Sequence, residues 1–247
     1  MPPVSVIVIC RDRVPHVSRC VASLLAQEGV SLGFDYEIIV VEQGNGNRKI
    51  LAGLPVRHIV LPYGRTTSMA WLRNVGTRRA RFDWLYHMDC DMILRNRTVS
   101  KLRNQIGDEL SAVPRVYGMT RRWGLTEKQT RQVQADPALP IRFGKYLTHG
   151  NPVLFHRPYL EWLGGYDERF WGHGCEDLDM MARVERTGGV CVHLRLYAWH
   201  QWHGESPVRT ANRANWKLYR TLRRKMRSDP ALAIRNPDGW GEGGREL

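Results

Sequence analysis

The sequence predicts an α/β fold with a largely parallel, doubly wound sheet. Apolar runs typical of buried strands occur at residues 4–9, 36–41, 56–60 and 84–88, and segments with helical spacing of apolar residues alternate with them. Such alternation indicates parallel strands joined by right-handed helical crossovers. The chain has 247 residues, 43% of them hydrophobic, which is enough for one sizeable core.

The first half of the chain supplies the strands on which a ligand site would form. Pro15 begins a helix that ends near Gly29, and the Thr-Thr-Ser sequence at 66–68 caps a second helix. The strand at 84–88 ends on Asp89 and Asp91. Because ligands gather beyond the carboxyl ends of strands in open α/β sheets, these two acids are expected at a binding site.

The second half has a less regular pattern. Strands are expected at 112–117, with Pro114 near an edge, at 150–155 and at 190–198, and short helices at 98–106 and 158–163. The polar stretch 120–140 is interpreted as an insertion or mobile loop that contains a helix at 127–134. In the helix that begins at the acids of 176–179, three residues are expected to face inward: Leu178, Met181 and Ala182.

The chain ends in a basic segment and a polar tail. From Pro207 a helix rich in Arg and Lys is predicted to dock on the protein with its charged face in solvent. The Gly-rich stretch from Pro237 is expected to be loose.

Charge and cysteine content narrow the setting. Lys and Arg number 37 against 24 Asp and Glu, a formal net charge of +13, which favours polyanionic or phosphate-bearing partners. Nucleic acid, an anionic membrane surface and a phosphorylated small molecule all satisfy this bias. Five scattered cysteines without paired spacing predict reduced thiols in a cytoplasmic protein, with peripheral attachment to a membrane surface left open. No run resembles a leader or a membrane span, so a secreted or integral protein is not expected.

Two groups of side chains are candidates for a metal site. Asp89 and Asp91 offer the oxygen ligands that Mg²⁺ and Mn²⁺ prefer, although solvated acids at a strand end would give the same pattern. His200 and His203 lie three residues apart, at ligand spacing, just after the last predicted strand. The alternative for the histidines is a buried cluster with the neighbouring tryptophans.

An aromatic, glycine-containing loop precedes a group of acids. Gly172 and Gly174 lie among aromatic residues, and glycines let a backbone pass close to a ligand. Three acids then open a helix: Glu176, Asp177 and Asp179. Acids in a first helical turn commonly complement the helix dipole, so each one alone needs no functional explanation.

The order and spacing of these segments resembles the GT-A glycosyltransferases of family 2 over residues 4–220. The first strand with Arg11, the second strand with Glu42, the helix with Arg73, and the pair of acids at 89 and 91 follow one another as in that family. The segment 164–179 is similar to the β-1,4-galactosyltransferase and chondroitin-polymerase types. Two positions depart from the pattern. Glu42 stands where many members have Asp, and His173 replaces a Trp common in the galactosyltransferase type.

The resemblance implies a set of site residues. It implies that the nucleotide-sugar donor is bound by six side chains: Arg11, Arg13, Glu42, Arg73, Asn74 and Asp89. It implies a bound Mn²⁺, or Mg²⁺, on four: Asp89, Asp91, His200 and His203. The acceptor would contact Trp171, Gly172, His173 and Glu176. Asp177 would be the catalytic base, with Glu176 holding hydroxyl groups beside it.

The implied function is a metal-dependent, inverting transfer of a hexose from a nucleotide diphosphate sugar to a hydroxyl acceptor, with a UDP-sugar as the favoured donor. An acceptor glycan, a lipid-linked saccharide, a protein and a modified DNA base all stay open. Two alternatives would use the same residues: a metal-dependent phosphodiesterase or nuclease acting on nucleic acid, and a non-catalytic sugar or nucleic-acid binder on a transferase scaffold.

One GT-A domain is expected over residues 1–227. It would comprise a nucleotide-binding half at 1–94, an acceptor and catalytic half at 95–206, and the basic helix at 207–227. A tail at 228–247 would follow.

Overall fold

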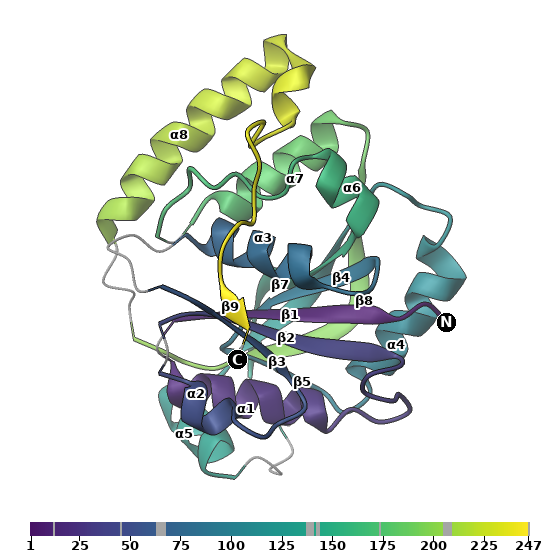
Figure 1. Cartoon of the computed structure of the whole chain (residues 1–247), viewed down its shortest axis with the longest axis vertical. Coiled ribbons are helices and arrows are strands. Elements are labelled where there is room, and N and C mark those ends of the chain that lie inside the picture. The colour runs from purple at the N-terminus through teal and green to yellow at the C-terminus, as the bar shows by residue number, and fades with distance from the viewer. Residues whose placement is uncertain are drawn as a thin grey trace.

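One mixed sheet runs through the protein (Figure 1). The computed structural model describes residues 1–11, 13–44, 46–62, 68–136, 141, 144–172, 174–204 and 209–246, and within them the strand order is β5-β8-β6-β7-β4-β1-β2-β3-β9. The strands are β1 Val4–Cys10, β2 Tyr36–Gln43, β3 Arg57–Leu61, β4 Trp84–Asp89, β5 Met92–Leu94, β6 Val116–Gly124, β7 Lys145–His156, β8 Val190–His200 and β9 Arg245–Glu246. The α-helices are α1 Val14–Leu25, α2 Arg48–Leu51, α3 Met69–Arg79, α4 Thr98–Gln105, α5 Glu127–Ala135, α6 Arg157–Trp162, α7 Glu176–Arg186 and α8 Arg209–Ser228.

The N-terminal strands form a parallel block. β1 pairs with β2 and β4, and β2 pairs with β3, all in the parallel direction. Every residue of β1 is buried because α1 and α4 cover one face of the sheet while α3, α6 and α7 cover the other (Figure 1). Ser68 caps α3 by accepting the Trp71 N–H at 3.1 Å, as its sequence predicts. The predicted α/β class is therefore confirmed.

Antiparallel pairing enters the sheet at β7. This strand lies between β4 and β6 and is antiparallel to both, whereas β6 and β8 are parallel to each other. β6 begins at Val116, after Pro114, and continues to Gly124, so the prediction of a strand at 112–117 followed by a loop from 120 is wrong. The polar residues after 119 form strand because β7 and β8 supply backbone partners on both sides, which outweighs their low hydrophobicity. The helix predicted at 127–134 is confirmed as α5.

The helix α7 has two packed faces instead of one. Its buried apolar residues on the sheet side are Met180 and Val184, while Leu178 and Ala182 are only partly buried and pack in the cluster that α8 completes. The prediction that Leu178, Met181 and Ala182 share the inward face is therefore wrong in detail. The reason is that α7 is enclosed between the sheet and α8, so both sides carry apolar residues (Figure 1). The docking of α8 confirms the expectation for the basic helix.

The C-terminal segment is ordered against the body of the protein, and the prediction of a loose tail is wrong. Trp240 is buried under the Arg78 guanidinium, which lies 4.9 Å from the ring, and β9 pairs with β3 (Figure 1). Gly164 shows how closely the backbones approach. Its φ of +75° favours glycine, and a Cβ there would lie 2.1 Å from the carbonyl oxygen of Arg235. Within the described residues, no helix has the length and apolar character that crossing a membrane requires.

Candidate active site

The candidate site lies where β1 and β4 end and where the chain leaves β8. Ile9 and Asp89 are register partners at the ends of the two parallel strands. The chain turns at Cys90 into β5, which pairs with the end of β8 so that Met92 lies opposite His200. The Gln201 N–H then donates to the Asp91 carbonyl at 2.8 Å. Three segments far apart in sequence are thereby brought to one edge of the sheet.

Asp91, His200 and His203 form a cluster at this edge. The Nε2 atoms of His203 and His200 lie 3.2 and 3.7 Å from Asp91 Oδ2, and one potential ligand atom from each residue lies within 4.8 Å of the others. Arg13 Nη1 donates to the same oxygen at 3.1 Å. Asp91 is buried, and its second oxygen, Oδ1, has no hydrogen-bond partner among the described residues.

Electrostatics in this cluster favour a charged carboxylate. Burial by itself would raise the pKa of Asp91, but His203, His200 and Arg13 together lower it to about 2. The hydrogen bond to Asp91 raises the pKa of His203, whereas burial lowers the pKa of His200. An anionic carboxylate beside imidazoles is the form in which these groups bind a cation.

The donor set fits a divalent metal ion. One carboxylate with two imidazoles is a common ligand set for transition metals, and it suits Mn²⁺ better than Mg²⁺, which prefers oxygen ligands alone. The unpartnered Asp91 Oδ1 supplies a further coordinating atom. Asp89 is not part of this cluster among the described residues, and its Oδ1 accepts a hydrogen bond from Arg73 instead. Its role as a fourth ligand stays a prediction.

Arg73 joins the strand end to the acids of α7. The side chain is almost fully buried on α3. It donates to Asp89 Oδ1 at 2.9 Å and to Glu176 Oε1 at 3.2 Å, and it lies 3.9 Å from Asp177 Oδ2. Burial by itself would lower the pKa of Arg73, but the surrounding acids, Asp177 first, raise it well above the ordinary value. One cation therefore faces three carboxylates.

The first turn of α7 presents two acids in different settings. Glu176 is buried, and its Oε2 accepts the Gly174 N–H at 3.0 Å. The Asp177 side chain is 37% exposed, although its Oδ1 atom is buried. Cys175 precedes them with a φ of 74°, a left-handed conformation that is uncommon for a residue with a Cβ. This sharp entry into the helix sets the direction of both carboxylates.

The aromatic loop before α7 is held from two sides. The Ser68 hydroxyl donates to the Phe170 carbonyl at 2.8 Å, and Ser68 forms a β-bridge with Gly172. From α8, the Asn215 amide donates to the carbonyls of Trp171 and Gly174 at 2.8 and 2.9 Å. Trp171 keeps 38% of its surface exposed next to the acids. His173, predicted to contact the acceptor, lies outside the described residues.

Comparison with known protein families decides the class of this site. The family profile described as Glycosyl transferase family 2 matches residues 5–161, which is more than half of the chain. The chain belongs to glycosyl transferase family 2. A second profile, Glycosyltransferase like family 2, matches residues 129–196 and extends the similarity through the start of α7 and most of β8. The comparison with curated proteins found no significant match.

Membership of glycosyl transferase family 2 establishes a glycosyltransferase on a GT-A fold, with a nucleotide-sugar donor and an acceptor in general terms. The narrower likeness to the β-1,4-galactosyltransferase and chondroitin-polymerase types is not confirmed by either profile. It stays an expectation for the segment 164–179.

Two residues predicted to bind the donor are used inside the protein. Glu42 is fully buried, accepts hydrogen bonds from the backbone and side chain of Asn47, and lies 2.9 Å from His58 Nε2. The Asn74 amide donates to the Tyr166 carbonyl and to Glu168, both at 2.8 Å, and its oxygen accepts the Tyr166 N–H. These surroundings favour structural roles, so their predicted contacts with the donor have no support from the geometry.

The arginines of the first strand's end are better placed than Glu42 and Asn74. Arg11 and Arg13 are both half-buried directly after β1, and Arg13 contacts the metal-site carboxylate. Sequence reasoning missed His16, whose ring lies 6.3 Å from the ring of His203 and whose Nε2 lies 3.1 Å from the Trp202 carbonyl. It also missed Tyr166, whose ring lies under Arg73 at 5.4 Å. Neither residue has a spacing that could have indicated its position.

Proposed function

We propose that this family 2 enzyme is a metal-dependent, inverting hexosyltransferase that uses a UDP-sugar as donor. The observation that carries the proposal is the position of Arg73, which contacts Asp89 at the end of β4 and Glu176 at the start of α7. The donor side and the candidate catalytic acids are therefore parts of one site, and the Asp91 cluster lies two residues from Asp89. A plain binding module would not need the acid at 177, and a nuclease would not need the aromatic, glycine-containing loop before it.

Asp91, His200 and His203 would hold Mn²⁺, or Mg²⁺, and Asp89 would support them from the strand end. The ion, when bound, supplies positive charge where the leaving diphosphate becomes negative. Arg11 and Arg13 add two permanent cations at the same edge of the sheet, which suits a diphosphate.

Asp177 would act as general base toward the acceptor. As the acceptor oxygen bonds to the anomeric carbon of the sugar, the bond from that carbon to the diphosphate oxygen breaks, and the hydroxyl proton passes to the Asp177 carboxylate. Attack from the side opposite the leaving group inverts the anomeric configuration. The positive end of α7 and the Arg73 guanidinium 3.9 Å away both favour the charged carboxylate that accepts the proton.

Glu176 and the aromatic loop would position the acceptor. Glu176 is fixed by Arg73 and by the Gly174 N–H, so its carboxylate has a defined orientation. Trp171 offers an exposed ring on which a sugar or base could stack, and Gly172 and His173 would complete this wall.

The proposal is tested by measuring the melting temperature of the protein with each of a panel of nucleotide sugars, in the presence and absence of Mn²⁺. A ligand that binds only the folded protein raises the melting temperature, so UDP-sugars should give the largest shift and should need the metal for it. The anomeric configuration of the product, assigned by NMR, then tests inversion. A panel in which no UDP compound shifts the melting temperature would exclude the donor assignment, and a retained configuration would exclude the role of Asp177.

A further inference from the structure

The outer face of α8 carries a regular row of cations. Its members are spaced four, three, four and three residues apart, which places them on one side of the helix over about 21 Å at 1.5 Å per residue. They are Arg213, Lys217, Arg220, Arg224 and Arg227. All five are exposed, because the opposite face of α8, with Tyr219, Leu222 and Met226, is buried. We call these five residues the cationic row.

Within the described residues, the members of the cationic row form no ion pairs with acids. The sequence of α8 contains eight Arg and Lys residues and no Asp or Glu. Like charges three and four residues apart on a helix repel one another and lower its stability. A polyanion along the row would remove that repulsion.

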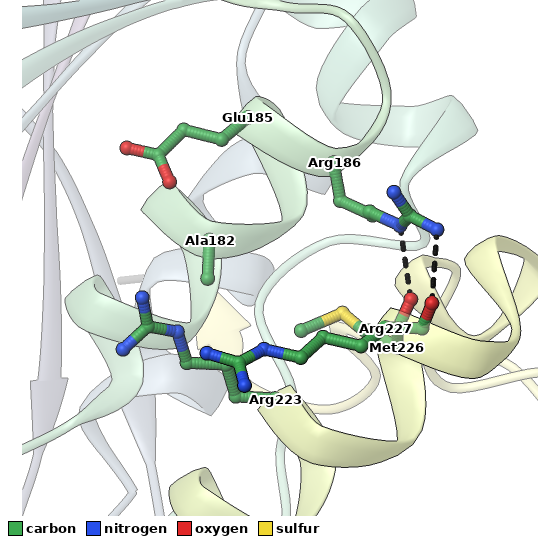
Figure 2. A pocket seen from close by; sticks show the side chains of 6 residues that line it. All are labelled: Ala182, Glu185, Arg186, Arg223, Met226 and Arg227. Carbon is green, nitrogen blue, oxygen red and sulfur yellow. Dashed lines mark hydrogen bonds between the residues drawn. The ribbon is translucent and has the colours of Figure 1, made fainter.

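Further arginines line a groove next to the row. It has a volume of about 230 Å³ and lies between α7 and α8, lined by Ala182, Glu185, Arg186, Arg223, Met226 and Arg227. Figure 2 shows the Arg223 and Arg227 side chains running next to each other along it, with Glu185 on the facing wall. Arg186 donates to the carbonyls of Met226 and Arg227 at 2.9 and 3.2 Å, which fixes the last turn of α8 on α7. The arginine side chains at this end of α8 therefore project from a helix whose position is fixed.

The row leads to the candidate active site. Asn215, in the first turns of α8 but buried on the face opposite the row, holds the loop that carries Trp171 and precedes Glu176 and Asp177. Trp216 is 40% exposed beside it, and the Arg220 guanidinium lies 5.8 Å from the Trp216 ring. A chain bound along the row would therefore have to pass over the N-terminal end of α8 to reach Asp177.

We infer that the cationic row binds the phosphate backbone of a nucleic acid, and that this nucleic acid carries the acceptor hydroxyl. A linear row of mostly arginine side chains suits successive phosphates, because guanidinium groups bind phosphate oxygens in pairs. An exposed tryptophan next to a cation, as Trp216 is next to Arg220, is typical of surfaces on which bases stack. An anionic membrane is the weaker candidate, because the apolar face that such a helix would insert is buried against α7.

The inference rests on the proposed function and names its acceptor class. A hydroxyl on a modified base would bond to the anomeric carbon through its oxygen, release its proton to Asp177 and displace UDP from the sugar. Nothing beyond the nucleotide-sugar donor is consumed.

The test measures binding of a fluorescein-labelled single-stranded 20-mer by anisotropy across a series of KCl concentrations. The variant replaces three members of the row: Arg220→Gln, Arg224→Gln and Arg227→Gln. The control removes three exposed cations elsewhere: Lys49→Gln, Lys101→Gln and Lys145→Gln. Because each phosphate contact on a single strand contributes about 0.7 to the slope of log K against log salt, the row variant should lose about 2 from the slope, and the control much less. Equal melting temperatures for the three proteins would show that folding is unchanged.

Two results would overturn the inference. In the first, the row variant and the control bind the oligonucleotide with the same salt slope. In the second, the wild-type protein sediments with vesicles of anionic phospholipid but does not bind the oligonucleotide. Melting-temperature shifts with UDP and Mn²⁺ on the same preparations separate this outcome from a failure of the proposed function. A normal shift without oligonucleotide binding refutes the acceptor class alone, whereas oligonucleotide binding without any nucleotide-sugar shift refutes the transferase proposal.

Discussion

The helix α7 contributes to two groups of charged side chains that differ in burial and in charge balance. Its second group joins Asp179 and Arg183 to Asp167 and Arg235, with Arg235 lying 3.0 Å from Asp167 and 3.3 Å from Asp179. All four side chains are buried, and the more exposed Arg169 adds a third base at Asp167, so this group has no excess of acids. The first group sets Arg73 against Asp89, Glu176 and Asp177, of which Asp89 and Asp177 are about one third exposed.

The difference separates a structural network from a site. In the closed group around Arg183, each charge has its partner within the protein, and the guanidinium of Arg183 also donates to the carbonyls of Ala233, Gly165 and Leu163. The group therefore connects the turn after α6 with the C-terminal segment. In the open group around Arg73, negative charge is in excess and reaches solvent, where a substrate can meet it. Neighbouring residues of one helix can thus have different roles, which depend on how their charges are balanced and how far they are exposed.

A matched pair of substitutions on α7 tests most directly whether the open group is catalytic and the closed group structural. Asp177→Asn keeps the size of the side chain but removes the proposed base, so turnover should fall by about 10²–10⁴-fold. Binding of UDP and Mn²⁺, measured by calorimetry, should stay near the wild-type value because neither uses this side chain. Turnover within a few-fold of wild type would exclude Asp177 as the base.

The partner variant, Asp179→Asn, should act on stability instead. It leaves the buried Arg183 and Arg235 with one acid fewer, and breaking a buried ion pair commonly costs about 3–5 kcal/mol. We expect a loss of that size in the free energy of unfolding from urea denaturation. Turnover per folded molecule, measured well below the melting temperature, should be little changed. A variant that keeps its stability but loses turnover would place Asp179 in the site as well.

The metal cluster gives a third, smaller effect. Asp91→Ala removes the carboxylate between the two histidines, and Mn²⁺ affinity should fall by about 100-fold or more, since even residues that only support metal ligands are worth 10–100-fold. UDP affinity measured with Mn²⁺ should then drop to the value found without metal. Asp83→Ala, at the opposite end of β4 and 68% exposed, is the matched control and should leave both affinities unchanged. Unchanged metal-dependent UDP binding in Asp91→Ala would move the metal site elsewhere.

The two acids at the end of β4 show what could and could not be predicted from the sequence. Their spacing predicted a candidate site at a strand end, because strand ends and acids follow local rules that a sequence contains, and the structure places Asp89 at the end of β4. The spacing could not separate their roles. The chain turns at Cys90, so Asp91 meets histidines from the far end of β8 while Asp89 meets Arg73, and both contacts depend on the sheet order.

The same limit explains the errors elsewhere. The strand β6 continues through polar residues because β7 and β8 enclose it, and no local pattern announces two partners that come from residues 145–156 and 190–200. The tail packs because Arg235 meets two acids from other segments. Arg73 was expected to bind the donor because of the family resemblance, and that contact stays a prediction. Its burial against Asp89 and Glu176 was not expected, because the acids come from other segments of the chain.

The closed group around Arg183 also makes the stability of the fold depend on pH. Burial by itself would raise the pKa of Asp167, but Arg169 and Arg235 bring it below its ordinary value. A carboxyl group whose pKa is lower in the folded protein stabilises the fold fully above its unfolded value, about 3.9, and this contribution is lost as the pH falls through the folded value. Asp179 has the opposite sign, because burial raises its pKa, so the two partly cancel and the net effect should be small.

We therefore expect the unfolding free energy of the wild-type protein to decline modestly between pH 5 and pH 3, and Asp167→Asn to show a shallower decline in the same window although its stability is lower throughout. Urea denaturation at a series of pH values measures both slopes, with Asp83→Asn as the exposed control. Since Asn cannot titrate, a slope in Asp167→Asn equal to that of the wild type would mean that carboxylates outside the closed group cause the acid sensitivity.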